Sequence, residues 1–138
     1  MSRENIDVVR RVYDAIGRGD TAAVLAAYDS EIEWDFSESP FRDVVNREVY
    51  RGHGGIRDFM RERLEDAWAD IEDHLDDVID AGEQVVTVVT SRGRGLASGA
   101  EVERTHAGVW TLRAGLITRV AWMGTRGEAL EAAGLSAG

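Results

Sequence analysis

The stretch Glu31-Ile32-Glu33-Trp34-Asp35-Phe36 decides how this chain is interpreted, because it sets an acid between two large aromatic residues. We interpret it as the first strand of the fold. Two environments are open for Asp35: a strand end that faces water, or an apolar pocket beside Trp34 and Phe36. The second environment would raise the pKa of the carboxyl group and suit it to proton transfer. The stretch thus points to a fold built around a pocket, without naming its ligand.

The composition is that of one soluble globular domain. The chain of 138 residues is long enough for one domain, over residues 1–138, with one sizeable core. Its residues are 43% hydrophobic and 30% charged. No apolar run approaches the roughly 18–20 residues that span a bilayer. The N-terminus has no signal-peptide pattern, so we expect a cytoplasmic location. A net charge of −10 argues against nucleic acid or a membrane as a partner. The lack of cysteine excludes disulfides, thiolate metal sites and cysteine nucleophiles.

The rest of the chain divides into helices followed by strands. Apolar spacing and β-branched runs predict helices over residues 4–17, 56–68 and 125–134, and strands over 71–79, 85–90, 101–112 and 116–123. A second, short helix is capped by Asp20 and turns Tyr28 inward. Residues 37–55 form a long loop, and Ala114-Gly115 a hairpin turn. Helices gathered before an antiparallel sheet indicate an α+β layer architecture.

Four segments together resemble a known family. They are VYDAIGRGD over 12–20, YRGHGGIRDF over 50–59, VWTLRAGLI over 109–117 and EALEAAGL over 128–135. In this order they resemble the NTF2-like superfamily, with its SnoaL-like and ketosteroid isomerase-like domains. The resemblance implies a cone, in which a curved antiparallel sheet wraps around N-terminal helices and encloses one pocket. It also implies a homodimer formed through the outer face of the sheet. Because this fold hosts enzymes, binding proteins and scaffolds, it does not fix an activity.

The resemblance also implies which side chains line the pocket. If Trp110 points inward, as the matching family position does, strand alternation turns further residues the same way. These are Arg104, His106, Gly108 and Leu112 on the same strand, and Thr118, Val120 and Trp122 on the next. The candidate ligand-binding residues are Tyr13, Tyr28, Trp34, Phe59, Arg92, Trp110 and Trp122. An arginine could hold a ligand carboxylate or be solvated, and the aromatic residues could form a ligand wall or ordinary core.

Asp35 and His106 are the candidate catalytic residues. Asp35 falls where ketosteroid isomerases carry their general base, and His106 could be its proton partner or a packed core histidine. The isomerase's oxyanion donors are not reproduced, because Tyr13 is about one position out of register and Gly108 replaces the acid. Steroid isomerisation is therefore not expected. The strand over residues 118–124 also lacks the carboxylate that a cyclase would use.

Three functions fit these observations. The first is a cofactor-independent acid–base enzyme of the isomerase, cyclase or hydrolase type, acting on a small apolar carbonyl compound. The second is a non-catalytic binding module for a hydrophobic small molecule, and the third is a dimeric scaffold with a filled cavity. No cofactor is expected. No metal is expected either, because His53, His74 and His106 lack the paired spacing of a zinc site.

Overall fold

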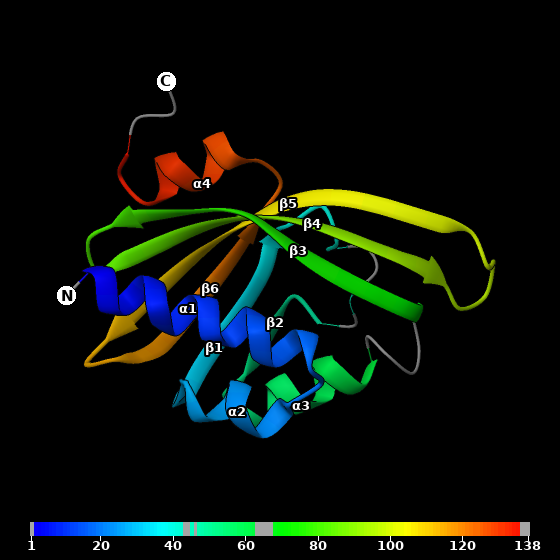
Figure 1. Cartoon of the computed structure of the whole chain (residues 1–138), viewed down its shortest axis with the longest axis horizontal. Coiled ribbons are helices and arrows are strands. Elements are labelled where there is room, and N and C mark those ends of the chain that lie inside the picture. The colour runs from blue at the N-terminus through cyan, green and yellow to red at the C-terminus, as the bar shows by residue number, and fades with distance from the viewer. Residues whose placement is uncertain (1, 43–44, 46, 63–67, 136–138) are drawn as a thin grey trace.

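A curved six-stranded sheet with helices on both of its faces organises the molecule, as a computed structural model shows (Figure 1). The structure describes residues 2–42, 45, 47–62 and 68–135. The helices are α1 (Ser2–Gly17), α2 (Thr21–Ala26), α3 (Gly52–Glu62) and α4 (Arg126–Ala132). The strands are β1 (Tyr28–Glu38), β2 (Val49–Arg51), β3 (Trp68–Ala81), β4 (Gln84–Gly95), β5 (Glu101–Arg113) and β6 (Leu116–Met123). The predicted α+β architecture is confirmed.

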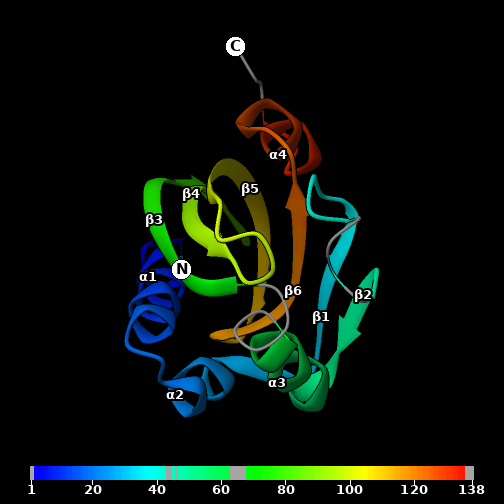
Figure 2. The same cartoon turned by 90° about the vertical axis from the view of Figure 1, so that its right-hand side faces the viewer.

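The sheet runs in the order β2-β1-β6-β5-β4-β3 and does not close. Its neighbouring strands are antiparallel, as predicted, with the exception of β1 and β6, which run parallel. Register shifts within the β1–β6, β3–β4 and β5–β6 pairs mark bulges, which bend strands and increase their twist. The resulting curve leaves a hollow side that α1, α2 and α3 occupy (Figure 2).

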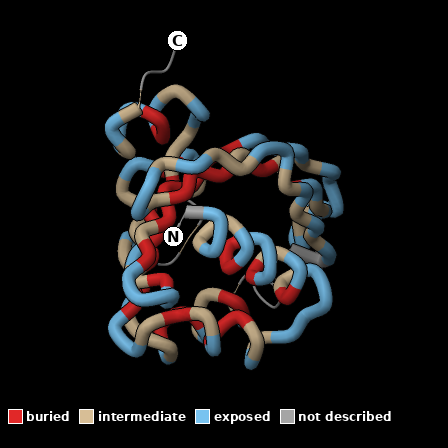
Figure 3. The backbone as a smooth tube through the Cα atoms, turned by 60° about the vertical axis from the view of Figure 1, so that its left-hand side comes forward, coloured by how far each residue is buried: buried red, intermediate tan, exposed pale blue. Residues whose placement is uncertain are grey.

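Each face of the sheet has its own core. The inner core joins α1, α2 and α3 to the hollow side, and its fully buried members include Val9, Ile56 and Trp110. On the outer face, Ala129 and Leu130 of α4 pack against small residues of β4, β5 and β6. Buried and exposed stretches therefore alternate along the strands and along α1 (Figure 3), as expected for amphipathic elements in a layered domain.

Two local predictions are confirmed in detail. The Thr125 hydroxyl accepts the backbone N–H of Glu128 at 3.1 Å and donates to its carboxylate at 3.1 Å, which caps α4. At the β5–β6 turn, Ala114 and Gly115 adopt φ of 53° and 81°. Two successive positive φ values are those of a type I′ hairpin turn.

Three element boundaries differ from the sequence prediction. Tyr28 begins β1, where it pairs with β6, and does not belong to the second helix. The predicted loop over 37–55 contains β2 and the first turns of α3, since β2 finds its partner in β1. Trp68 belongs to β3, opposite Gly95, because strand pairing overrides its helical spacing. Leu64 and Ala67, predicted as helical, lie outside the described residues.

Candidate functional site

An aromatic wall covers the inner face of the sheet, and the alternation of β1 sets its orientation. Ile32, Trp34 and Phe36 are buried on the inner side, whereas Glu33 and Asp35 between them are partly exposed on the outer side. The other helices and strands bring the remaining rings. We define the aromatic wall as Tyr13, Tyr28, Trp34, Phe36, Phe59, His106, Trp110 and Trp122.

Trp34 lies in the middle of the aromatic wall. Its ring centroid is 5.0 Å from that of Phe59, 5.3 Å from that of Trp122 and 6.0 Å from that of Tyr28. The interplanar angles of these pairs lie between 66° and 81°, the edge-to-face arrangement that the ring quadrupoles favour. The structure thus brings six predicted ligand-binding residues into one cluster, and their binding of a ligand stays a prediction. The six are Tyr13, Tyr28, Trp34, Phe59, Trp110 and Trp122.

A buried hydroxyl joins α1 to the aromatic wall. The Trp110 indole N–H donates to Thr87 Oγ1 at 2.9 Å, and Tyr13 Oη lies 3.2 Å from the same oxygen. Thr87 and Trp110 are both fully buried. Because an indole can only donate, Thr87 must accept from Trp110, while in the bond between Tyr13 and Thr87 either hydroxyl can be the donor. This network fixes the positions of the Tyr13 and Trp110 side chains relative to β4.

Three other polar groups of the aromatic wall are buried and have no hydrogen-bond partner among the residues that the structure describes. They are Tyr28 Oη, Trp34 Nε1 and Trp122 Nε1, from side chains only 3%, 2% and 7% exposed. Burial raises the pKa of Tyr28 well above its ordinary value, and the neighbouring Tyr13 adds to the rise. The Trp34 indole lowers this pKa and offsets part of the rise, although it does not reach hydrogen-bond geometry. Tyr28 therefore keeps its proton.

His106 lies on the inner face of β5, as predicted, and is 9% exposed. Its ring packs edge-on against Phe41 and Trp122, with centroids 5.1 Å and 5.6 Å away. Gly108, Trp110 and Leu112 follow on the same face, as alternation predicts. The imidazole is therefore built into the aromatic wall.

Of the two environments that the sequence left open for Asp35, the structure shows no apolar pocket around its carboxylate. Its carboxylate lies on the outer face, where it accepts from Arg119 Nη2 at 2.7 Å and from the Ser37 backbone N–H at 2.9 Å. Partial burial acts to raise the pKa of Asp35, but these hydrogen bonds and the guanidinium charge outweigh it and lower the pKa below its ordinary value. Trp34 and Phe36 cannot desolvate the group, because alternation turns them to the other face. Asp35 and His106 consequently do not form a pair.

Two more predicted positions differ in the structure. Arg92 lies on the outer face of β4, where its Nε donates to Glu103 at 2.6 Å, and its side chain is 71% exposed. Arg104 occupies the inner face, in register with the buried Ser91. Thr118, predicted to point inward, lies at the β5–β6 register shift and donates to the Thr111 carbonyl at 3.3 Å. The shift turns Ile117 into the inner core in its place.

The three histidines have different surroundings in the fold. His53 Nε2 lies 3.0 Å from the Tyr28 carbonyl oxygen, and His74 lies beside Asp76 on the outer face. In the part of the chain that the structure describes, no group of three or more His, Asp or Glu side chains is placed to hold a metal ion. None of the described helices has the length and apolar character needed to cross a bilayer.

The family follows from the sequence match that accompanies this fold. Residues 9–120 match the family model of the SnoaL-like domain, which covers most of the chain. The chain belongs to the SnoaL-like family. A comparison with curated proteins found no match.

Solved NTF2-like structures share the fold of this SnoaL-like domain. An NTF2-like protein from Burkholderia pseudomallei K96243 has a TM-score of 0.77 at 22% identity, with 93% of this chain and 95% of that chain covered. TerC, co-crystallised with polyporic acid, has a TM-score of 0.77 at 20% identity, with 95% and 98% covered. An NTF2-like protein from Burkholderia thailandensis E264 has a TM-score of 0.74 at 28% identity, with 86% and 88% covered. The predicted family and cone-like fold class are thus confirmed.

In this SnoaL-like domain, packing explains why position 108 is glycine. A Cβ atom there would lie 2.9 Å from Trp110 Nε1, 3.0 Å from Trp122 Cζ3 and 3.1 Å from Thr87 Oγ1. Contacts this short force a neighbour to move. The tryptophans and Thr87 therefore occupy the space that an acidic side chain at Gly108 would need.

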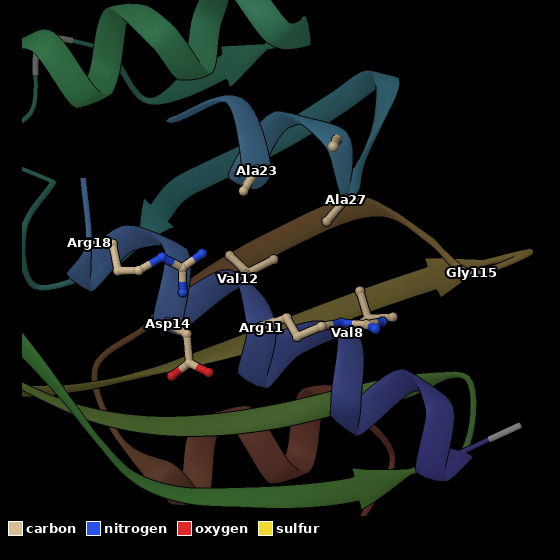
Figure 4. A pocket seen from close by; sticks show the side chains of 9 residues that line it. Val8, Arg11, Val12, Asp14, Arg18, Ala23, Ala27 and Gly115 are labelled. Atoms are coloured by element: carbon tan, nitrogen blue, oxygen red, sulfur yellow. The ribbon is translucent and has the colours of Figure 1, made fainter. Parts of the chain in front are cut away.

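A surface groove of the SnoaL-like domain lies between α1, α2 and the β5–β6 turn, apart from the aromatic wall (Figure 4). Its floor is apolar, and Arg11, Asp14 and Arg18 stand at its rim. Arg18 also pairs with Asp20 at 3.7 Å. No predicted site residue lines this groove.

Sequence reasoning missed two residues beside the aromatic wall. Thr87 lies in the valine-rich run of β4, opposite Gly108, and Phe41 follows Pro40 in the predicted loop. Thr87 could have been found, because it shares the inward phase of Val85 and faces the strand of Trp110. Phe41 carries no such signal, since loop geometry alone brings it to His106.

Proposed function

We propose that this SnoaL-like domain is a cofactor-independent acid–base enzyme acting on a small, mostly apolar carbonyl compound, with His106 as the group that transfers the proton. The observation that carries the proposal is the buried imidazole of His106, held between Phe41 and Trp122 in an otherwise apolar wall. An imidazole changes charge near neutral pH, which suits it to take a proton next to a carbonyl and return it.

The composition supports this choice of chemistry. The sequence has sixteen arginines, no lysine and no cysteine. Covalent catalysis through a lysine Schiff base or a thiolate therefore has no nucleophile in this sequence. The polar groups of the aromatic wall include an imidazole and two phenols, which suit proton transfer. TerC, a protein of the same fold, was co-crystallised with polyporic acid, which supports a small organic molecule as the ligand here.

In this proposal Asp35 has no part in proton transfer. Its salt bridge with Arg119 stabilises the outer face of the β1–β6 pair, and its lowered pKa makes it a weak base. The homodimer and the cytoplasmic location remain predictions from the sequence.

Exchange of α-protons in D2O tests the proposal without knowledge of the complete reaction. The protein is incubated with 2-tetralone, 1-indanone and acetophenone, and deuterium uptake is followed by NMR. We expect His106→Gln to slow exchange by about 100- to 10,000-fold, the usual contribution of general acid–base catalysis. His74→Gln is the matched control, because this histidine is exposed on the outer face. Asp35→Asn should also exchange normally.

A binding module is the second candidate function, favoured by the three unpartnered donors of the aromatic wall. Tight binding of these ketones with no exchange above the buffer rate would show that the protein is a binding module and would refute the acid–base function. Normal exchange in His106→Gln together with lost exchange in Asp35→Asn would show that Asp35, and not His106, is the general base.

A further inference from the structure

Tyr28 Oη, Trp34 Nε1 and Trp122 Nε1 are buried donors for which the described protein supplies no acceptor. They lie around one ring, since the Trp34 centroid is 6.0 Å from that of Tyr28 and 5.3 Å from that of Trp122. Native proteins pair nearly all buried polar groups, so three unpaired donors in one cluster require an explanation. A ligand that brings acceptors is the explanation that also accounts for their clustering.

The chemistry of these groups defines that ligand. An indole N–H only donates, and the Tyr28 hydroxyl keeps its proton because burial raises its pKa. A carboxylate ligand would have to lose its hydration without a partner cation in the aromatic wall, which is costly. A neutral carbonyl oxygen accepts two hydrogen bonds and loses little hydration. Neutral carbonyl compounds are therefore the class that this part of the aromatic wall can bind.

We propose that the aromatic wall is a donor site for a ligand with two carbonyl oxygens, one bound by Tyr28 and Trp34 and the other by Trp122. Tyr28 and Trp34 are assigned to one oxygen because their rings are neighbours, with centroids 6.0 Å apart and an edge-to-face arrangement. Trp122 serves the other, on the side of the aromatic wall that His106 contacts. The inference rests on the proposed function, because it assigns the ligand groups of the same site.

Two buried donors that already have acceptors, Trp110 of the aromatic wall and Tyr50 beside it, give an internal reference for this proposal. The Trp110 indole already donates to Thr87 at 2.9 Å, and the Tyr50 hydroxyl donates to Glu62 at 2.8 Å. Trp110 and Tyr50 are as deeply buried as the proposed donors. A ligand oxygen should affect the unpartnered donors and leave these two partnered groups unchanged.

The test uses three probes of similar size with no, one and two carbonyl groups: naphthalene, 1-tetralone and 1,4-naphthoquinone. The sequence has no cysteine or lysine side chain for the quinone to alkylate. Affinities are measured by calorimetry, and indole N–H signals by ¹⁵N-resolved NMR. We expect affinity to rise about tenfold with each carbonyl, the worth of a well-placed hydrogen bond. The quinone should shift the Trp34 and Trp122 signals downfield and leave the Trp110 signal in place.

Two matched variants separate recognition from packing. Tyr28→Phe should lower the affinity for the quinone about tenfold, leave that for naphthalene unchanged, and leave thermal stability unchanged or raised, because it removes an unpaired buried hydroxyl. Tyr50→Phe should lower stability and preserve the preference for the quinone over naphthalene. The wild-type indole shifts test the proposal even where a variant fails to fold.

The outcomes distinguish this proposal from the function on which it rests. Equal affinity for naphthalene and the quinone, or a shift of the Trp110 signal alone, would overturn the donor site and leave the acid–base function standing. An equal loss of quinone preference in both tyrosine variants would also overturn the donor site. Failure of all three probes to bind would overturn the aromatic wall as a binding site, and with it the proposed function.

Discussion

Thr87 is the residue whose replacement tests the packing of the aromatic wall most directly. The substitution Thr87→Val keeps the size and β-branched shape of the side chain and removes its hydroxyl group. Trp110 then loses its acceptor at 2.9 Å, and Tyr13 loses the oxygen at 3.2 Å. Neither water nor another group of the strand can replace the hydroxyl without movement, since Thr87 and Trp110 are 0% exposed.

The magnitude follows from these contacts. A net hydrogen bond is worth about 0.5–1.5 kcal/mol, and a buried donor left unpaired costs about 1–3 kcal/mol. The methyl group gained by valine recovers up to about 0.8 kcal/mol through apolar burial. We therefore expect Thr87→Val to lower the free energy of unfolding by about 2–3 kcal/mol. For a chain of this length, each kcal/mol shifts Tm by about 4 °C, so Tm should fall by about 8–12 °C.

Urea unfolding followed by tryptophan fluorescence and far-UV circular dichroism measures the change. The matched control is Thr90→Val on the same strand, whose hydroxyl donates to Asp76 at 2.5 Å on the outer face. A bond to an exposed carboxylate is replaced by water, so this control should change the free energy of unfolding by about 0.5 kcal/mol or less. Equal stability of the two variants would refute the reasoning, because buried and exposed hydroxyls would then contribute alike.

Two further predictions concern the outer face and the β5–β6 turn. The pKa of Asp35 is lowered in the folded state, so its pairing stabilises the fold above the ordinary pKa of about 3.9 and is lost as pH falls through the folded value. Asp35→Asn should therefore lower the free energy of unfolding at pH 7 by about 1 kcal/mol and make it decrease less steeply at acidic pH. Urea unfolding at a series of pH values measures this, and an unchanged decrease at acidic pH would contradict the prediction. Ala114 adopts φ of 53° before Gly115, so Ala114→Asn creates the preferred Asn-Gly pair of a type I′ turn and should stabilise the fold by about 0.5–1 kcal/mol. Calorimetry measures the gain, and a lower Tm would count against the turn geometry.

Local patterns predicted most of the fold because they act over a few residues. The strand over 116–123 has the predicted bounds, and the capping box of Thr125 forms as expected. Trp68 shows where this logic ends. Its spacing from the apolar residues of α3 suits a helix, but its structure is decided by pairing with Gly95, 27 residues later in the chain. No window of local sequence contains that partner.

Alternation predicted the inner face of β5 well and that of β6 less well. The phase from His106 to Trp110 runs without interruption, so every second residue faces the aromatic wall. The register shift between Thr111 and Leu112 adds one residue to the opposite strand, which turns Ile117 inward and Thr118 aside. A bulge of this kind depends on sheet curvature, which residue types alone do not specify.

Regular alternation along β1 explains the position of Asp35 and decides the character of the site. A residue between two inward-facing neighbours in a strand points to the other face of the sheet. Asp35 is thereby paired with Arg119, and the aromatic wall keeps His106 and protonated Tyr28 in place of a carboxylate. The aromatic wall itself has no fixed charge and favours neutral ligands, because a charged ligand would lose its hydration there and gain no ion pair. The ligand should then be selected by how well it accepts hydrogen bonds, and the series of naphthalene, tetralone and naphthoquinone measures that property directly.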